Sequence, residues 1–254
     1  MSYFPGNDWD IEVRKGNVPK HSVVSIIGHA ETVGTQKITI TPELSTGDID
    51  QSDLTTTAAT VDVASTSAND VDTTGTGLRT LLLMGLSGAG VPQSETIALN
   101  GQTEVTSVNT YSAVLGFRGL TAGTTNSNEG VIWVGNGVFT AGLPATKYFS
   151  GDIEFNKGHT AYYVVPAATT FLGTKFIANL SSTNKDVEFF IETSVDGIFW
   201  VTEVAFGMTS GATMESIIRA MPPFAAGTHI RIRAESTTAT TDITVILDGY
   251  LLAD

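Results

Sequence analysis

Three carboxylates lie close together in the segment Asp48-Ile49-Asp50-Gln51-Ser52-Asp53 and resemble part of a calcium-binding loop. Calcium needs several oxygen ligands at once, and calcium loops supply them from alternating acidic residues. The helical calcium loop also needs an acidic residue at the position of Ser52 and a glycine at the position of Asp53. The pattern therefore fits an irregular calcium site at Asp48, Asp50 and Asp53, and it also fits a solvated acidic loop.

The other metal-binding side chains show no local pattern. The chain has four histidines, and none has a second histidine at a metal-ligand spacing within one element. Two histidines and a carboxylate could still meet in space, but surface or hydrogen-bonded histidines are the expectation. The absence of cysteine excludes disulfides, thiol catalysis, zinc-thiolate sites and iron–sulfur clusters.

The glycine-rich segment from Gly85 to Gly90 invites comparison with a phosphate loop or a nucleophile elbow. A phosphate loop needs Lys-Ser or Lys-Thr at the start of a helix, whereas Val91-Pro92 follows here. A nucleophile elbow needs a glycine two residues after the serine, and Ala89 occupies that place. The segment therefore predicts a hairpin or β-bulge loop. No catalytic or cofactor-binding residue is assigned, and the chain is predicted not to be an enzyme.

The composition is that of a folded, acidic protein. Apolar residues make up 41% and charged residues 15% of 254 residues, with a formal net charge of −13. Such a surface repels nucleic acids and anionic membranes, and it favours solubility at high copy number, although habitat alone also explains it. The start has no signal-peptide pattern, and no apolar run could span a bilayer. We therefore expect cytoplasmic synthesis, with export only as part of a larger particle.

The spacing of apolar residues predicts an all-β chain of short strands between turns rich in Gly, Asn, Ser and Asp. The one helical candidate is residues 213–221, which could equally be a strand or loop. Strands at this spacing predict two β-sandwich or jelly-roll-like domains, at residues 35–145 and 146–254, preceded by an extended arm at residues 1–34. We expect the arm, with its aromatic residues, to dock on a neighbouring subunit or on its own chain.

Two hairpins are predicted from dipeptides that favour positive φ. Asn100-Gly101 would join residues 94–99 to residues 103–106, and Asp196-Gly197 would join residues 187–192 to residues 199–204. In residues 229–234 isoleucines alternate with Arg231 and Arg233, which fits a strand with one wet face. The two arginines predict a guarded edge strand or a contact between subunits with the acidic segment 43–72. Trp133 and Trp200 are predicted to pack in the cores.

Several segments in the same order along the chain resemble structural proteins of marine tailed bacteriophages. Those proteins usually have Gly where this chain has Lys20, and each motif alone is weak. The resemblance covers most of the chain and rests on residues 10–22, 67–70, 75–80, 85–86, 95–101, 121–126, 162–167, 196–199 and 247–252. It implies a component of the virion, of either the head or the tail, and it implies no catalytic residues.

The resulting hypothesis is a virion structural protein, either a capsid decoration or cement protein or a tail or fibre component. It would form a homo-oligomer, as a trimer or ring, and bind the major capsid or tail proteins, but neither nucleic acid nor membrane. The interface candidates are Tyr3, Phe4, Trp9, Arg14, Arg231 and Arg233.

Two alternatives remain open. A carbohydrate-binding module for a host surface glycan would require Trp133, Trp200, Tyr162 and Tyr163 to be exposed. A polysaccharide hydrolase would require acids clustered in a cleft.

Overall fold

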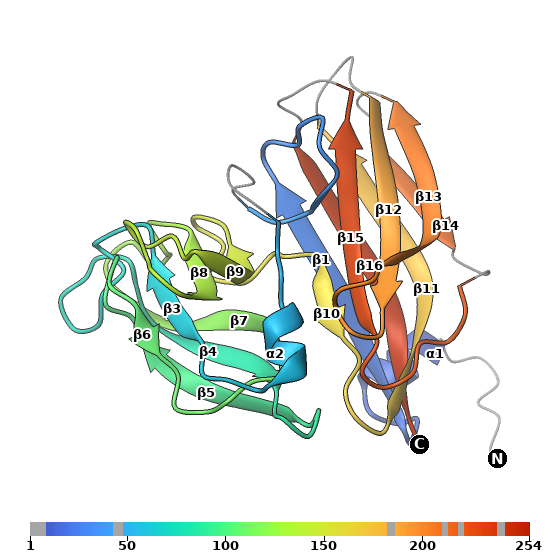
Figure 1. Cartoon of the computed structure of the whole chain (residues 1–254), viewed down its shortest axis with the longest axis horizontal. Coiled ribbons are helices and arrows are strands. Elements are labelled where there is room, and N and C mark those ends of the chain that lie inside the picture. The colour runs from blue at the N-terminus through green and yellow to red at the C-terminus, as the bar shows by residue number, and fades with distance from the viewer. Residues whose placement is uncertain (1–8, 43–47, 182–185, 210–212, 218–220, 238–241) are drawn as a thin grey trace.

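The computed structural model describes residues 9–42, 48–181, 186–209, 213–217, 221–237 and 242–254. Regular structure in these segments is almost entirely β-strand, which confirms the predicted all-β class. Figure 1 shows two bodies of β-strands side by side, which we call the N-terminal and the C-terminal sandwich. The helices are α1 (Trp9–Arg14) and α2 (Ser52–Thr56). Within the described segments, no helix is long and apolar enough to cross a membrane.

The N-terminal sandwich consists of two antiparallel sheets around one core. Its strands are β3 (Asp62–Ser65), β4 (Leu78–Leu86), β5 (Pro92–Ala98), β6 (Val105–Thr106), β7 (Ala113–Ala122), β8 (Ile132–Asn136) and β9 (Thr146–Gly151). The sheet orders are β6-β3-β8-β9 and β5-β4-β7. Alternate residues such as Leu81, Leu83 and Phe117 from one sheet meet Val63 and Ile132 from the other.

The C-terminal sandwich is built in the same way around a larger core. Its strands are β1 (His21–Ala30), β2 (Ile38–Thr39), β10 (Tyr162–Val164), β11 (Thr169–Leu180), β12 (Asp186–Ser194), β13 (Val201–Thr209), β14 (Thr213–Ile217), β15 (His229–Ser236) and β16 (Ile243–Ala253). The sheet orders are β1-β16-β11-β14 and β10-β15-β12-β13, and β2 pairs with β15. Aromatic contacts such as Phe176 with Phe189 and Phe206 fill the space between the sheets.

The N-terminal arm packs on its own chain, which is one of the two alternatives that the sequence leaves open. Residues 21–30 form β1, which pairs with β16 from His21 opposite Leu252 to Ala30 opposite Ile243 (Figure 1). Side chains of a strand alternate between its two faces, and the inner face of β1 contributes Ile26 to the core of the C-terminal sandwich. The arm therefore buries its apolar residues in its own chain. Residues 9–14, which the sequence predicts as part of an extended arm, form the helix α1 instead. Tyr3 and Phe4 lie outside the described residues.

The boundary between the two bodies also differs from the predicted one. β9 pairs with β8, and Tyr148 and Phe149 pack in the N-terminal core, so this sandwich continues past residue 145. β2, which the sequence placed in the first domain, pairs with β15 of the C-terminal sandwich. Strand pairing depends on partners distant in sequence. A boundary predicted from local turns therefore assigned both β2 and β9 to the wrong sandwich.

Two of the predicted local elements have different partners or forms. Asn100-Gly101 does form a turn, with Gly101 at φ +62°, but β5 pairs with β4 while β6 pairs with β3. The preceding Gly85–Gly90 segment makes the β4–β5 hairpin, as predicted, and this fixes the partner of β5. The helical candidate contains strand β14, which pairs with β11.

A buried carboxylate ties together the loops of the N-terminal sandwich. Asp70 is fully buried, and its oxygens accept hydrogen bonds from Ser65 Oγ at 2.5 Å and from three backbone N–H groups. These groups belong to Leu78 at 2.7 Å, Glu129 at 2.9 Å and Gly130 at 2.9 Å. One carboxylate thus accepts hydrogen bonds from the ends of β3 and β4 and from the segment before β8. These charge-assisted bonds hold the three segments together.

The two sandwiches meet at a third apolar cluster. Trp133 is fully buried there, because its neighbours Ile132 and Val134 face the N-terminal core and β-strand side chains alternate. It packs with Tyr162 and Val164 of β10 from the other body. The sequence predicted a core position for Trp133, and the structure places it at the junction between the sandwiches.

Candidate functional site

The β12–β13 connection forms a tight hairpin that ends in exposed apolar side chains. Gly197 has φ +73°, and β12 and β13 pair from Asp186 to Thr193, which confirms the hairpin predicted from Asp196-Gly197. Val195, Ile198, Phe199 and Val201 are 84%, 66%, 72% and 48% exposed. We call residues 195–201 the hairpin tip. Clustered exposed apolar residues typically mark an interaction surface, whereas single ones do not.

Hydrogen bonds hold the hairpin tip in one conformation. Asp196 Oδ1 accepts backbone N–H bonds from Ile198 and Phe199, each at 2.9 Å, and a bond from Ser194 Oγ at 2.9 Å. Ser194 Oγ in turn accepts the N–H of Gly197 at 2.9 Å. The Phe199 and Ile198 N–H groups and Ser194 hold the pKa of Asp196 below its usual value. A tip ordered in this way loses little entropy when a partner covers it.

The strand that follows the hairpin tip is an edge strand. β13 pairs with β12 and ends its sheet, so among the described strands nothing pairs with its outer side. An edge strand presents a row of free backbone N–H and C=O groups, which can pair with a strand from another chain. The tip and the β13 edge together therefore offer an apolar anchor beside a hydrogen-bonding edge.

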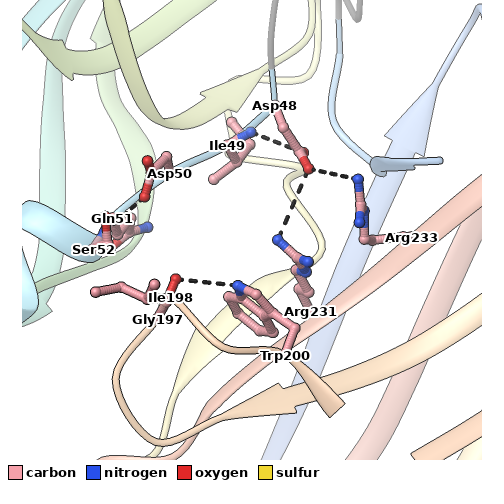
Figure 2. Close-up of a pocket in the computed structure, with 10 residues that line it drawn as sticks. All are labelled: Asp48, Ile49, Asp50, Gln51, Ser52, Gly197, Ile198, Trp200, Arg231 and Arg233. Atoms are coloured by element: carbon pink, nitrogen blue, oxygen red, sulfur yellow. Dashed lines mark hydrogen bonds and ion pairs between the residues drawn. The ribbon is translucent and has the colours of Figure 1, made fainter. Parts of the chain in front are cut away.

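A pocket of about 320 Å³ lies beside the hairpin tip, at the junction of the sandwiches. Figure 2 shows residues 48–52 along the top and left of it, Ile198 and Trp200 below, and Arg231 and Arg233 on the right. Asp48 Oδ2 lies 3.1 Å from Nη2 of Arg233 and 3.9 Å from Nη1 of Arg231 (Figure 2). Its Oδ1 accepts the N–H groups of Thr39 and Ile49.

Arg231 and Arg233 do not lie on an edge strand, which was one of the two predictions from the sequence. β15 lies between β12 and its partners β10 and β2, so it is an inner strand. The predicted partner, the acidic segment 43–72, does meet these arginines through Asp48, but the contact is within one chain. Guanidinium groups with little exposure to solvent need a counter-charge, and Asp48 and Glu192 supply it. The backbone carbonyl of Lys37 accepts a further hydrogen bond from Arg233.

Glu192 is the central acid of this junction. It lies directly opposite Arg231 in the β12–β15 register, and its Oε2 accepts bonds from Nε and Nη2 of Arg231, each at 2.9 Å. Lys37 pairs with its other oxygen. Burial raises the pKa of Glu192, but the hydrogen bond from Lys37 and the charge of Arg231 outweigh it and hold the pKa below its usual value. These ion pairs fasten the segment that contains Lys37 to the sheet.

Aromatic groups complete the junction. The guanidinium of Arg231 lies over the half-buried ring of Trp200, 3.7 Å from its centroid. Tyr162 Oη lies 2.6 Å from Nδ1 of the buried His229, whose Nε2 lies 3.2 Å from Thr55 Oγ1 of the other sandwich. Burial raises the pKa of Tyr162 and lowers the pKa of His229 to about 4. The hydroxyl of Tyr162 therefore donates to Nδ1, and Nε2–H donates to Thr55.

The three calcium candidates are not brought together. Asp48 faces Arg231 and Arg233, Asp50 accepts the N–H of Ser52, and Asp53 accepts the hydroxyl of Tyr148 at 2.5 Å. Each carboxylate thus has its own partner within the chain, and two guanidinium groups beside Asp48 repel a cation. Among the described residues, the group with the geometry to hold a metal ion is a different one, namely His29, Glu31 and Asp152.

The remaining site residues are distributed as follows. Trp9 and Arg14 lie on α1, where Trp9 is half exposed and packs edge-on against His21. Trp133, Tyr162 and Tyr163 are buried, and Arg231 covers the ring of the half-buried Trp200. The aromatic residues that a carbohydrate-binding module would use are therefore not exposed platforms. The exposure of the apolar side chains at the hairpin tip is not evident from the sequence, although four of them fall within seven residues.

Comparisons with known proteins give no family. No protein-family model matches the chain, and no curated protein matches it. The structure of the infectious bursal disease virus Gx strain matches with a TM-score of 0.21 and 11% identity, over 92% of this chain and 77% of that one. Infectious bursal virus derived T=1 particles match with a TM-score of 0.20 and 10% identity, over 92% and 74% of the two chains. Such low TM-scores do not show a shared fold, and no property of this chain is inferred from them.

Proposed function

We propose that this chain is a structural protein of a tailed-phage virion that acts by binding copies of itself and other virion proteins. It would serve as a capsid decoration or cement protein, or as a component of the tail or its fibres. The observation that carries the proposal is the hairpin tip, where Val195, Ile198, Phe199 and Val201 are exposed on a hydrogen-bonded turn. Burying one such side chain contributes about 1.5–3 kcal/mol, so the tip suits a protein partner.

The partner in this proposal is first of all a second copy of the chain. The β13 edge beside the tip can extend its sheet into another subunit, and a repeated contact between two different surfaces closes as a ring or trimer. The ordered phage-like motifs of the sequence support placement on the virion, with the major capsid or tail proteins as further partners. Assembly would occur in the host cytoplasm, and no role in binding nucleic acid or membrane is proposed.

A catalytic role is not part of the proposal. The ionisable groups around the junction pocket are paired with one another, as Glu192 is with Arg231 and Lys37, and Asp48 is with Arg233. Groups held in this way fix the geometry of the junction, whereas a general acid or base must exchange protons with a substrate.

The test of the proposal is the location of the chain in particles of the phage whose genome encodes it. Mass spectrometry of purified particles should detect the chain at many copies, and electron cryo-microscopy should show paired sandwiches repeated on the head or the tail. Deletion of residues 1–30 is not a suitable test, because it removes strand β1 from the C-terminal sandwich. Absence of the chain from purified particles would contradict the proposal.

A further inference from the structure

A histidine and two carboxylates converge where β1 meets the segment that follows β9. The ligand atoms of His29, Glu31 and Asp152 all lie within 4.8 Å of one another. His29 lies near the end of β1 and Glu31 directly follows this strand, whereas Asp152 directly follows β9. The group therefore joins the C-terminal sandwich to the N-terminal one.

The imidazole of His29 is oriented as a metal ligand would be. Its Nδ1 lies 3.0 Å from Thr244 Oγ1, and its Nε2 lies 3.5 Å from Asp152 Oδ2. In metal sites the ring nitrogen that does not bind the metal almost always has such a hydrogen-bond partner, which fixes the ring. Asp152 is also fixed, because its Oδ1 accepts the N–H of Ile153 at 2.7 Å.

The charges around His29 leave an excess of negative charge. Asp152 is only 7% exposed, and within the described residues its one ion-pair partner is His29. Asp242 lies 3.8 Å from the other side of the ring, and Glu31 has no hydrogen-bond or ion-pair partner in the described part of the chain. A nearly buried carboxylate with a second carboxylate close to it is costly to desolvate, and a bound cation would supply a counter-charge.

A second histidine lies next to this group. His159 accepts the backbone N–H of His29 on its carbonyl at 3.0 Å, and Phe155 contacts both imidazole rings. Nδ1 of His159 is buried, and no hydrogen-bond partner for it is present among the described residues. An imidazole nitrogen that has no partner in the described part of the chain therefore lies beside the group.

We propose that His29, Glu31 and Asp152 bind a divalent transition-metal ion, with zinc as the probe. An imidazole nitrogen with carboxylate oxygens is a ligand set that suits zinc, whereas calcium and magnesium prefer oxygen ligands alone. Glu31 is exposed and can move toward the ion, and water would complete the coordination. An ion at this position links the two sandwiches and stabilises the folded chain.

The test is isothermal titration of chelator-treated full-length protein with zinc chloride, together with thermal unfolding. We expect one zinc ion per chain and a rise in Tm of roughly 5 °C or more at a free zinc concentration about 100 times the dissociation constant. Magnesium chloride should not raise Tm in the same way. A chelator-treated protein that does not bind zinc would overturn the proposal.

Matched variants separate this site from adventitious binding. Glu31→Gln and Asp152→Asn should each weaken zinc binding by about tenfold or more. Glu154→Gln removes an exposed carboxylate near Asp152. His21→Gln removes a half-buried histidine at the opposite end of β1. Both variants should bind zinc as the unaltered chain does. Because Glu31 is exposed, its variant folds even if Asp152→Asn does not. Unchanged affinity in Glu31→Gln would overturn the three-ligand site.

Discussion

The carboxylate of Asp196 accepts the backbone N–H of Phe199 at 2.9 Å, while the ring of Phe199 is 72% exposed. A polar network thus holds an apolar side chain in water, at the end of a sheet whose edge strand is free on its outer side among the described strands. Folding alone gives no reason to place this ring there, because a monomer gains nothing from exposing it. A partner that covers the ring gives one.

Replacing Asp196 should loosen the hairpin tip without removing its apolar side chains. Asp196→Ala removes the acceptor of the Ile198 and Phe199 N–H bonds, so association should weaken because the tip must be ordered on binding. We expect self-association about tenfold weaker, as measured by sedimentation equilibrium. Glu188→Ala, an exposed acid on β12, serves as the control and should associate normally. Equal association of both variants would show that the network does not order the tip for binding.

Neutralising Glu192 should strongly destabilise the C-terminal sandwich. Glu192→Gln removes the carboxylate that pairs with Lys37 and leaves Arg231 and Arg233 with Asp48 as their acidic partner. Breaking a buried ion pair costs about 3 kcal/mol or more. We expect a Tm lower by roughly 6 °C or more in scanning calorimetry, against little change for Glu188→Gln on the same strand. Equal effects of the two changes would mean that the junction charges do not stabilise the fold.

His229 should make stability depend on pH between about 6.5 and 4. Its folded pKa of about 4 lies below the unfolded value because of burial, so the unfolded chain binds a proton first as the pH falls. The contribution of His229 to the free energy of unfolding is fully present above about pH 6.5 and decreases toward about pH 4. The total decrease is at most about 3 kcal/mol.

Urea unfolding across this pH range checks the role of His229. The free energy of unfolding of His229→Gln should fall less steeply with decreasing pH. A smaller slope should remain, because burial also lowers the pKa of His159. Identical slopes in the two proteins would contradict the assignment to His229.

Asp70 should be as important to the N-terminal sandwich as Glu192 is to the other. Asp70→Asn places an amide NH₂ group among backbone N–H donors from Leu78, Glu129 and Gly130. The loss of charge-assisted bonds costs about 3 kcal/mol. Scanning calorimetry should show a clear fall in Tm for Asp70→Asn and almost none for Glu104→Gln, an exposed acid in the same sandwich. A small effect at Asp70 would mean that its loops are held by other contacts.

The sequence predicted the strands and turns better than their partners. The alternation in residues 229–234 and the Asp196-Gly197 turn depend on neighbouring residues, so β15 and the turn between β12 and β13 could be predicted. The pairing of β1 with β16 joins opposite ends of the chain, and no local pattern specifies it. Asp48 and Asp70 both belong to one acidic segment, and only the folded chain shows that one binds arginines and the other backbone donors.

The most direct test of the account is the oligomeric state of the purified chain by sedimentation velocity over a range of concentrations. We expect a trimer or ring for the unaltered chain and a monomer for the double variant Ile198→Ser/Phe199→Ser, whose changes are at exposed positions and should leave the fold intact. The control Val108→Ser/Val138→Ser removes isolated exposed valines and should remain oligomeric. A monomer at every concentration for the unaltered chain, or an oligomer unaffected by the tip variant, would contradict the account.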